Sequence, residues 1–358
     1  MGTIRIGIVG LGANSRLRHL PGFRACPDVE ITAVCNRRPE STQQAAREFD
    51  IPRTFEHWQD LVTDDIVDAV LVGTWPYLHC AVTLKALASG KHVLTEARMA
   101  RNLTEAKRMQ AAAAEHNDLV TQIVPSPLGL RAGRVVERML NDGYLGELRE
   151  FIVTGTNADL VDPKTPLHWR QSTELSGWNS LALGILHETL IRWLPNPIGV
   201  FASTHVYTPS RTDPDTGCQV RVHRPDSVHV LTRLPSGARG IYHLSGGIHH
   251  GPGLGIQLFG SEGAIRYDFA PTDQLFAARG GEDLREIDIS EEEQGTWQVE
   301  ADFIEAIRTS SASPNLTDFA TGVRYMEFTE AVEISAQSGQ PVSLPLTDPD
   351  PPLHSDSM

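Results

Sequence analysis

A glycine-rich turn directly after the first apolar run is the part of the chain best suited to nucleotide chemistry. Residues 4–9 have the composition of a short β-strand, and Gly10 and Gly12 follow them. In such a turn the first glycine makes the tight bend and the second lets backbone N–H groups approach a phosphate, while the next helix directs its positive end at the anion. Ser15 occupies the third small position instead of Gly or Ala, so the fingerprint is imperfect. The residues expected at a dinucleotide pyrophosphate are Gly10, Gly12, Ala13, Asn14 and Ser15.

The end of the second predicted strand indicates which dinucleotide would bind. Enzymes that use NAD usually carry an acidic side chain there, which holds the ribose 2′-OH. This chain has Asn36, Arg37 and Arg38 instead, with no carboxylate. Asn36 could hydrogen-bond the ribose, and a planar guanidinium could pair with a 2′-phosphate. The pattern favours NADP over NAD, although both arginines could also be solvated loop charges.

The turn after the third long strand adds residues expected along the cofactor. Residues 73–79 read Gly-Thr-Trp-Pro-Tyr-Leu-His. Trp75 is expected to stack near the cofactor, whereas His79 is more typical of the start of a helix than of a catalytic group. The cofactor-binding residues expected in this turn are Thr74, Trp75, Pro76 and His79.

Alternating strands and helices must position these groups. Up to about residue 125, apolar strands alternate with helical segments, including one expected at 81–89, and this order is typical of a parallel sheet with crossover helices. From Glu147 onward, long runs of alternating polar and apolar residues predict an open, largely antiparallel sheet, which a helix at about 180–194 interrupts.

The expected fold is therefore α/β, with a Rossmann domain at residues 1–125 and an α+β domain with a large, mostly antiparallel open sheet at 126–345. The last helices could pack back on the first domain, and residues 346–358 read as a loose tail. The active site is expected between the domains, at the carboxyl ends of the parallel strands.

Bulk composition excludes several other classes of protein. The 358-residue chain carries a formal net charge of −14, which argues against a nucleic-acid partner because phosphate contacts need basic patches. No apolar run approaches the ~20 residues that span a bilayer, and no secretory signal is visible at the N-terminus. The four cysteines are scattered without a C-x-x-C motif, so reduced thiols in a cytoplasmic protein are expected.

Six segments share their order and spacing with one enzyme family. They are residues 10–12, 18–23, 73–79, 88–96, 143–147 and 259–263. Together they resemble the glucose–fructose oxidoreductase/inositol dehydrogenase (Gfo/Idh/MocA) family, from about residue 4 to about residue 345. The resemblance implies tightly bound NAD or NADP and the oxidation or reduction of carbon–oxygen bonds in sugars, cyclitols and related small molecules. It also implies a homo-oligomer, a dimer or tetramer, in which strands at 199–207 and 227–244 could supply the packing face.

The chain departs from this family at both catalytic motifs. Where family dehydrogenases carry Glu-Lys-Pro, this sequence has Glu96, Ala97 and Arg98. In the family's Asp-x-Gly-x-His motif, the Asp and His positions fall on Ala182 and Leu186, and a histidine comes one residue later. One residue turns a helical side chain by about 100°, so His187 cannot simply replace the missing base without a local shift in register.

The remaining polar side chains supply the candidate catalytic groups. We expect His187 to act as acid and base, with Glu188 or Glu96 orienting it or the substrate. Arg98 cannot take a proton, and its expected role is to stabilise negative charge or hold a carboxylate. Substrate contacts are expected from His168, Arg170 and Tyr242, and the residues expected to form one polar cluster facing the cofactor are His168, Arg170, His187 and Glu188.

The same residues suggest three other functions: a metal site, an enzyme with no net redox change, and a cofactor-binding sensor. No metal is expected, because the spacing of His187, His243, His249 and His250 matches no zinc pattern. A lyase, glycosidase or epimerase that oxidises its substrate transiently on a tightly bound cofactor would need the same cofactor site. A non-catalytic cofactor-binding sensor would explain the missing catalytic residues. The leading reading is an NAD(P)-dependent oxidoreductase of a small polar hydroxy or keto compound.

Overall fold

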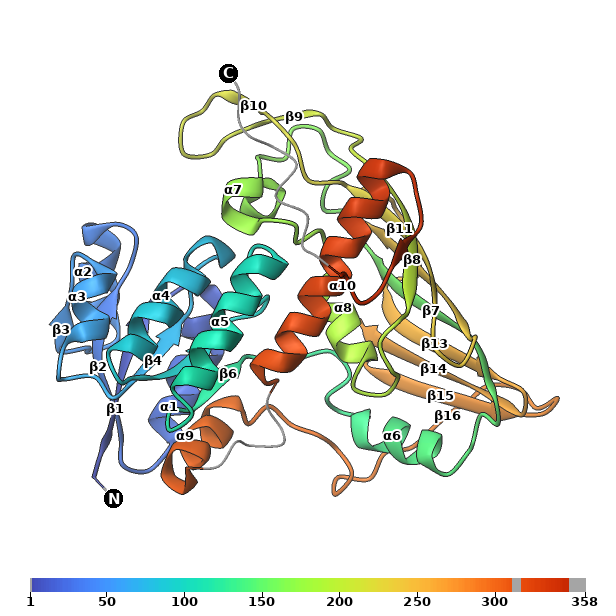
Figure 1. Ribbon diagram of the computed structural model, residues 1–358, viewed down its shortest axis with the longest axis horizontal. Helices are drawn as coiled ribbons and strands as arrows, with labels where there is room; N and C mark the ends of the chain where they lie inside the picture. Colours follow the sequence, from blue (N-terminus) through green and yellow to red (C-terminus); the bar gives the residue numbers. More distant parts are fainter. Residues whose placement is uncertain (1, 311–316, 348–358) are drawn as a thin grey trace.

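The computed structural model describes residues 2–310 and 317–347. Most of the expected tail, residues 348–358, lies outside them. The described part contains two large sheets that lie side by side and are joined by long helices (Figure 1). This arrangement confirms the expected α/β fold class.

The first sheet has six parallel strands in the order β3-β2-β1-β4-β5-β6. The order reverses between β1 and β4, which is the switch point where ligands bind in doubly wound sheets. Neighbouring strands pair in parallel throughout, and β4 is buried along its whole length because helices cover both faces. The strands are β1 (Ile4–Val9), β2 (Val29–Cys35), β3 (Arg53–Thr54), β4 (Ala69–Val72), β5 (His92–Thr95) and β6 (Thr121–Ile123).

Helices from both ends of the chain cover this sheet. One face packs against α1, α2 and the late helix α9, whose Phe303 meets Phe23 edge-on at 6.4 Å between ring centroids. The other face packs against α3 and α4. The helices are η1 (Ser15–His19, a π-helix), α1 (Leu20–Ala25), α2 (Pro39–Glu48), α3 (Trp58–Thr63), α4 (Pro76–Ala88), α5 (Leu103–Glu115) and α9 (Val299–Thr309).

The fourth helix differs from the expectation of a helix at 81–89. It begins five residues earlier, at Pro76, which fits the preference of proline for the first helical position. Residues 76–79, which were expected in the cofactor turn, therefore belong to helix α4. The helix expected at 180–194 is also shorter, because α8 spans only Leu183–Leu190.

The second sheet has nine strands in the order β16-β15-β14-β13-β7-β12-β11-β8-β17. Adjacent strands are antiparallel except for β7 and β12, which pair in parallel at the centre, so the expected antiparallel character holds for most of the sheet. The strands are β7 (Leu148–Thr156), β8 (Gly199–His205), β11 (Ser227–Arg233), β12 (Arg239–Ser245), β13 (Leu254–Gly260), β14 (Gly263–Ala270), β15 (Gln274–Arg279), β16 (Arg285–Glu286) and β17 (Val342–Ser343).

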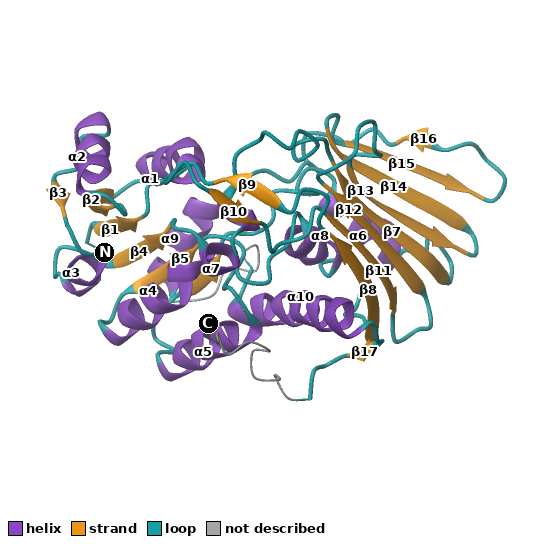
Figure 2. Cartoon of the chain, turned by 90° about the horizontal axis from the view of Figure 1, so that it is seen from above, coloured by secondary structure: helices purple, strands orange, loops and turns teal. Residues whose placement is uncertain are grey.

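Helices cover one face of the second sheet and leave the other face open (Figure 2). The covering helices α6 (Gly133–Asn141), α8 and α10 (Phe319–Ser338) contribute to one apolar core with the inner face of the strands. Helix α10 also packs against α5, so it connects the two halves of the molecule. A small hairpin of β9 (Ser210–Thr212) and β10 (Gln219–Arg221) projects from the second half toward the first (Figure 2). No helix in the described ranges has the length and apolar character needed to cross a membrane.

Candidate functional site

The glycine turn lies at the switch point of the first sheet and forms the base of a groove of about 560 Å³. Gly10 has a φ of +90°, and a Cβ there would lie 2.7 Å from the Thr74 side chain, so only glycine fits. A Cβ at Gly12 would meet only the Gly73 carbonyl, at 3.7 Å, so the space in front of this residue is open. The buried Ser15 donates to the Gly10 carbonyl over 3.2 Å, which explains how serine is tolerated at the third position.

The side chain of Asn36 braces this turn. Its Oδ1 accepts a 2.7 Å hydrogen bond from the Leu11 N–H, and its Nδ2 donates to the Ser41 carbonyl over 3.1 Å. Asn36 therefore lines the groove, but both its polar atoms already have partners. Each of these atoms can make one more hydrogen bond, so the contact of Asn36 with a ribose stays a prediction.

The second half of the molecule reaches over the groove at two points. Arg37 and Arg38 both form ion pairs with Asp215, at 2.6 and 2.9 Å, and Asp215 lies in the loop of the β9–β10 hairpin. Trp75 stacks on Trp169 at 5.6 Å between ring centroids and an interplanar angle of 15°. Trp75 and Arg37 line the groove, as expected, and each also contacts a residue distant in sequence.

His79 was expected among the cofactor contacts, and the structure instead buries it beneath the site. Its Nδ1 lies 3.0 Å from the Arg98 carbonyl and its Nε2 lies 3.0 Å from the Thr74 carbonyl. Burial lowers the pKa of this imidazole below its usual value. The ring therefore connects the two turns that follow β4 and β5, and it presents no free nitrogen to a ligand.

Glu96, directly after β5, belongs to a charged network that the sequence did not predict. Its Oε1 contacts His19 Nε2 at 2.9 Å and accepts from Asn14 Nδ2 at 2.5 Å. The opposite nitrogen of His19 lies 2.5 Å from Glu300, to which the Trp297 indole N–H also donates. Between two carboxylates, the pKa of the buried His19 rises to about 9 despite desolvation, so this imidazole is cationic at neutral pH.

Arg98, two residues further, is a buried guanidinium with no counter-ion among the residues that the structure describes. It is only 4% exposed, and its Nε–H has no hydrogen-bond partner. Its aliphatic stem passes over Gly184 at the start of α8, where a Cβ would lie 2.6 Å from Arg98 Cδ. Desolvation, together with the positive charge of Arg170, lowers the pKa of Arg98 to about 9, so the group stays cationic at neutral pH.

His187 lies in the apolar core beside the second sheet, which contradicts its expected role as acid and base. Its ring stacks on Phe328 at 3.6 Å, and its Nδ1 contacts the Tyr242 hydroxyl at 2.7 Å. Burial without a neighbouring charge lowers the pKa of His187 to about 3. Both His187 and Tyr242 are fully buried, so Tyr242 is not the expected substrate contact either.

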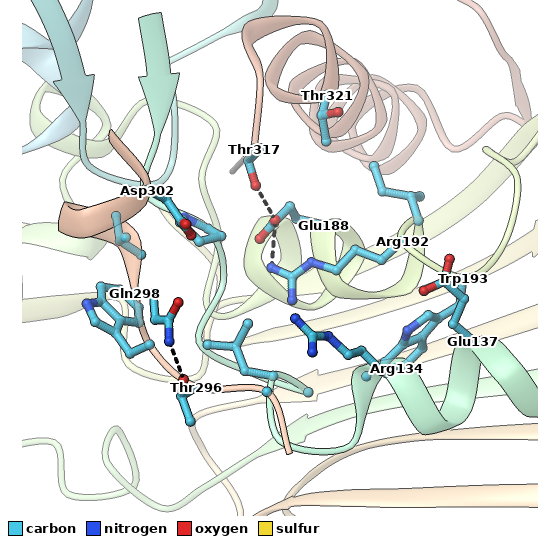
Figure 3. A pocket seen from close by; sticks show the side chains of 18 of the residues that line it. Arg134, Glu137, Glu188, Arg192, Trp193, Thr296, Gln298, Asp302, Thr317 and Thr321 are labelled. Carbon is cyan, nitrogen blue, oxygen red and sulfur yellow. Dashed lines mark hydrogen bonds and ion pairs between the residues drawn. The ribbon is translucent and has the colours of Figure 1, made fainter. Parts of the chain in front are cut away.

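Glu188 points in a different direction, into a pocket of about 430 Å³ between α6, α8 and α9 (Figure 3). Its carboxylate is held by Arg192 at 2.8 Å, the Thr317 hydroxyl at 2.7 Å and the Ser126 N–H at 2.6 Å. These contacts satisfy the carboxylate, and it touches neither His187 nor Glu96. Adjacent residues of a helix diverge by about 100°, which is why His187 and Glu188 do not converge.

His168 and Arg170 remain exposed near the groove, on either side of Trp169. His168 Nδ1 accepts a hydrogen bond from the Arg170 N–H over 3.2 Å, which places the ring proton on Nε2 in the neutral form. Desolvation and Arg170 lower the pKa of His168, so the neutral form dominates at pH 7. The Arg170 guanidinium lies over the Trp169 ring at 4.3 Å and within electrostatic range of Glu96.

The expected four-residue cluster is therefore divided. Arg170 lies within electrostatic range of Glu96 and Arg98, with His168 beside it, whereas His187 is in the core and Glu188 is in a separate pocket. His19 and Glu300 were missed because they lie far from Glu96 in sequence, and no local motif marks them. Within residues 2–310 and 317–347, no three His, Cys, Asp or Glu side chains are grouped in a way that could hold a metal ion.

Comparison with known proteins identifies the family. The model described as "Oxidoreductase family, NAD-binding Rossmann fold" matches residues 4–123, and the "GFO/IDH/MocA C-terminal domain" matches residues 134–266. Levoglucosan dehydrogenase of Pseudarthrobacter phenanthrenivorans is 25% identical over 304 residues, which cover 78% of this chain and 77% of that protein. A dTDP-3,4-didehydro-2,6-dideoxy-alpha-D-glucose 3-reductase of Actinomadura kijaniata is 31% identical over 182 residues, 51% of this chain and 53% of that one.

Solved structures share the whole fold. Levoglucosan dehydrogenase in complex with NADH and L-sorbose superposes with a TM-score of 0.82 at 22% identity, covering 96% of this chain and 99% of that one. An oxidoreductase domain protein from Kribbella flavida gives a TM-score of 0.83 at 23% identity, covering 97% and 100%. With a Rossmann sheet, a glycine turn at its switch point and both family domains matched in order, the chain belongs to the Gfo/Idh/MocA family and is an NAD(P)-dependent oxidoreductase.

Proposed function

We propose that the protein transfers hydride between NADP and a carbon that bears a hydroxyl or carbonyl group in a sugar-like molecule. The observation that carries this proposal is the groove at the β1/β4 switch point, where the backbone of Gly10 makes the bend and the open face of Gly12 leaves room for a diphosphate. The nicotinamide of a bound cofactor would supply or accept the hydride. The named relatives include a sugar dehydrogenase and a sugar-nucleotide reductase, which supports the substrate class.

The side chains beyond the groove define what the protein contributes to catalysis. With alanine in place of the family lysine, Arg98 and Arg170 supply positive charge on the substrate side of the site, where it can hold an anionic group. His168 takes the place proposed for His187 as the group that faces the reacting oxygen. During reduction its Nε2–H donates a hydrogen bond that polarises the carbonyl, and the alkoxide formed by hydride transfer takes its proton from water. Glu96 is held by His19 and Asn14 and positions the nicotinamide half of the cofactor.

The function is tested by following absorbance of the reduced nicotinamide with purified protein and a panel of sugars, polyols and their keto forms. We expect turnover with at least one member and a fall in kcat of about 10²-fold or more in His168→Leu, the usual size of a lost hydrogen bond to a developing oxyanion. Consumption of substrate at constant absorbance would instead show a reaction with no net redox change. Bound cofactor with no consumption across the panel would contradict the proposal.

Arg37 and Arg38 are proposed to bind the 2′-phosphate of NADP. In this structure their cationic groups share the Asp215 carboxylate, which lowers the pKa of Asp215 through the Arg37 hydrogen bond. A 2′-phosphate offers the same two guanidinium groups a stronger, doubly charged acceptor. Asp215 would then be a competitor that NADP displaces and NAD does not.

We expect NADPH to bind at least tenfold more tightly than NADH, as measured by fluorescence titration. The double variant Arg37→Ala/Arg38→Ala should remove this difference, and Asp215→Asn should strengthen NADPH binding several-fold while leaving NADH within twofold. Arg47→Ala, an exposed arginine on α2, controls for the change in net charge. Equal affinities in the parent protein would contradict the preference for NADP. Weaker NADH binding in Asp215→Asn would show that Asp215 holds a ribose hydroxyl of NAD instead.

We also propose that the open face of the second sheet forms a homo-oligomer. Phe201, Leu231 and Ile241 are 42%, 55% and 47% exposed, and the strand register places them side by side on β8, β11 and β12. Ile152 of β7 continues the row. Light scattering of the purified protein should show a dimer or tetramer, and Leu231→Asp should shift it toward the monomer. A monomeric parent protein would contradict this assignment.

A further inference from the structure

The buried cation at Arg98 has no partner in the part of the chain that the structure describes. Arg98 is 4% exposed, and its Nε–H lacks an acceptor. The titratable groups within range are Arg170, which repels it, and the neutral Tyr325 phenol. Removing a charge from water without a counter-ion is costly, and proteins normally compensate it with a carboxylate. The unpaired, buried guanidinium of Arg98 is therefore the feature that needs an explanation.

The start of helix α8 adds a second positive feature at the same place. The N-cap residue Ala182 makes no side-chain hydrogen bond to the first turn. The Arg98 stem lies directly against Gly184 in that turn. A cation beside the positive end of a helix is repelled by it, whereas an anion would be attracted by both groups at once. Neither feature has a described acidic side chain beside it.

Arg170 completes the arrangement from the side of the groove. Its guanidinium is held over Trp169, whose ring stacks on Trp75 at the edge of the cofactor groove. Arg170 is within electrostatic range of both Arg98 and Glu96. Glu96 is already bonded to His19 and Asn14, so it does not serve as the partner of either arginine.

We infer that Arg98, Arg170 and the N-terminal end of α8 form an anion subsite that binds a carboxylate of the substrate. The substrate is then a carboxylated sugar or polyol, such as a uronate or an aldonate, and not a neutral sugar. The planar fork of a guanidinium matches the two oxygens of a carboxylate. This inference rests on the proposed function for the identity of the substrate, but the anion subsite can be measured by binding alone.

The test is isothermal calorimetry on the full-length protein saturated with NADPH, at constant ionic strength. Matched pairs are titrated: glucuronate against glucose, gluconate against glucitol, and tartrate against threitol, with glucose 6-phosphate and inorganic phosphate as the other anions. We expect carboxylates to bind at least 30-fold more tightly than their neutral partners. Arg98→Gln should reduce the difference to less than threefold, Arg98→Lys should keep part of it, and Arg170→Gln should reduce it by about tenfold.

Arg47→Gln is the matched control, since it removes one positive charge from α2 and should leave the preference unchanged. Circular dichroism checks that the variants fold, and if Arg98→Gln does not fold, Arg98→Lys and the surface variant Arg170→Gln decide. Equal binding of charged and neutral partners, or no carboxylate binding at all, overturns the inference. Binding of phosphates but not carboxylates, with the same dependence on Arg98, overturns the carboxylate assignment. A carboxylate preference without any NADP reduction would support the anion subsite and contradict the proposed redox function.

Discussion

Replacing Gly10 by alanine is expected to abolish dinucleotide binding and to destabilise the fold, whereas alanine at Gly12 should weaken binding without destabilising the protein. At Gly10 the new Cβ would lie 2.7 and 2.8 Å from the Thr74 side chain and backbone nitrogen, in a residue whose φ is +90°. The strain and the clash together should lower the free energy of unfolding by roughly 2–4 kcal/mol. The displaced turn would no longer align its amides, so affinity for NADPH should fall at least 100-fold.

Gly12→Ala is the informative partner of this substitution. Its Cβ would meet only the Gly73 carbonyl at 3.7 Å, so the folded protein should lose less than about 1 kcal/mol in urea unfolding. The methyl group would instead occupy the space in front of the turn, and NADPH should bind at least tenfold more weakly. Undiminished affinity in both variants, measured by fluorescence titration, would mean that the diphosphate does not lie at this turn.

The second large effect is expected in the pH dependence of stability, and its source is His19. The folded-state pKa of about 9 lies above the ~6.5 of an unfolded histidine, so protonation is linked to folding. The resulting stabilisation is fully present below pH 6.5 and is lost as the pH rises through 9. A shift of this size corresponds to something on the order of 2–3 kcal/mol.

Urea unfolding at several pH values measures this contribution. The difference in unfolding free energy between the parent protein and His19→Gln should be largest at pH 6 and should shrink by on the order of 2–3 kcal/mol by pH 9.5. Glu300→Gln removes one of the two carboxylates and should lower the pH at which the stability is lost. His249→Gln, at an exposed position, should show no such slope. A pH-independent difference for His19→Gln would mean that His19 is neutral in the folded protein.

The residues predicted at the cofactor could be identified from the sequence because they are close together in the chain. Gly10 and Gly12 belong to one turn after one strand, and backbone geometry determines their role. Arg37 lines the groove, and Arg37 and Arg38 share the partner Asp215, which is far away in sequence; their contact with a cofactor stays a prediction.

The substrate half was not predictable, because it depends on which face of a helix meets which sheet. His187 has the residue type of a base, yet it stacks on Phe328 and contacts Tyr242 in the core. Glu188, next to it, is about 100° away and is bound by Arg192 and Thr317 (Figure 3).

The sequence by itself determined the parallel sheet and the glycine turn, since both follow from hydrophobic periodicity and from residues close together in the chain. It also indicated the family, through the resemblance of six segments. Only the tertiary structure decided that His19 lies between Glu96 and Glu300, and that Arg98 is buried beside the start of α8 with no acidic partner in the described ranges. The physical reason is that a charge takes its pKa and its partners from groups brought near by packing. Those contacts join residues as much as 281 positions apart, which no local pattern encodes.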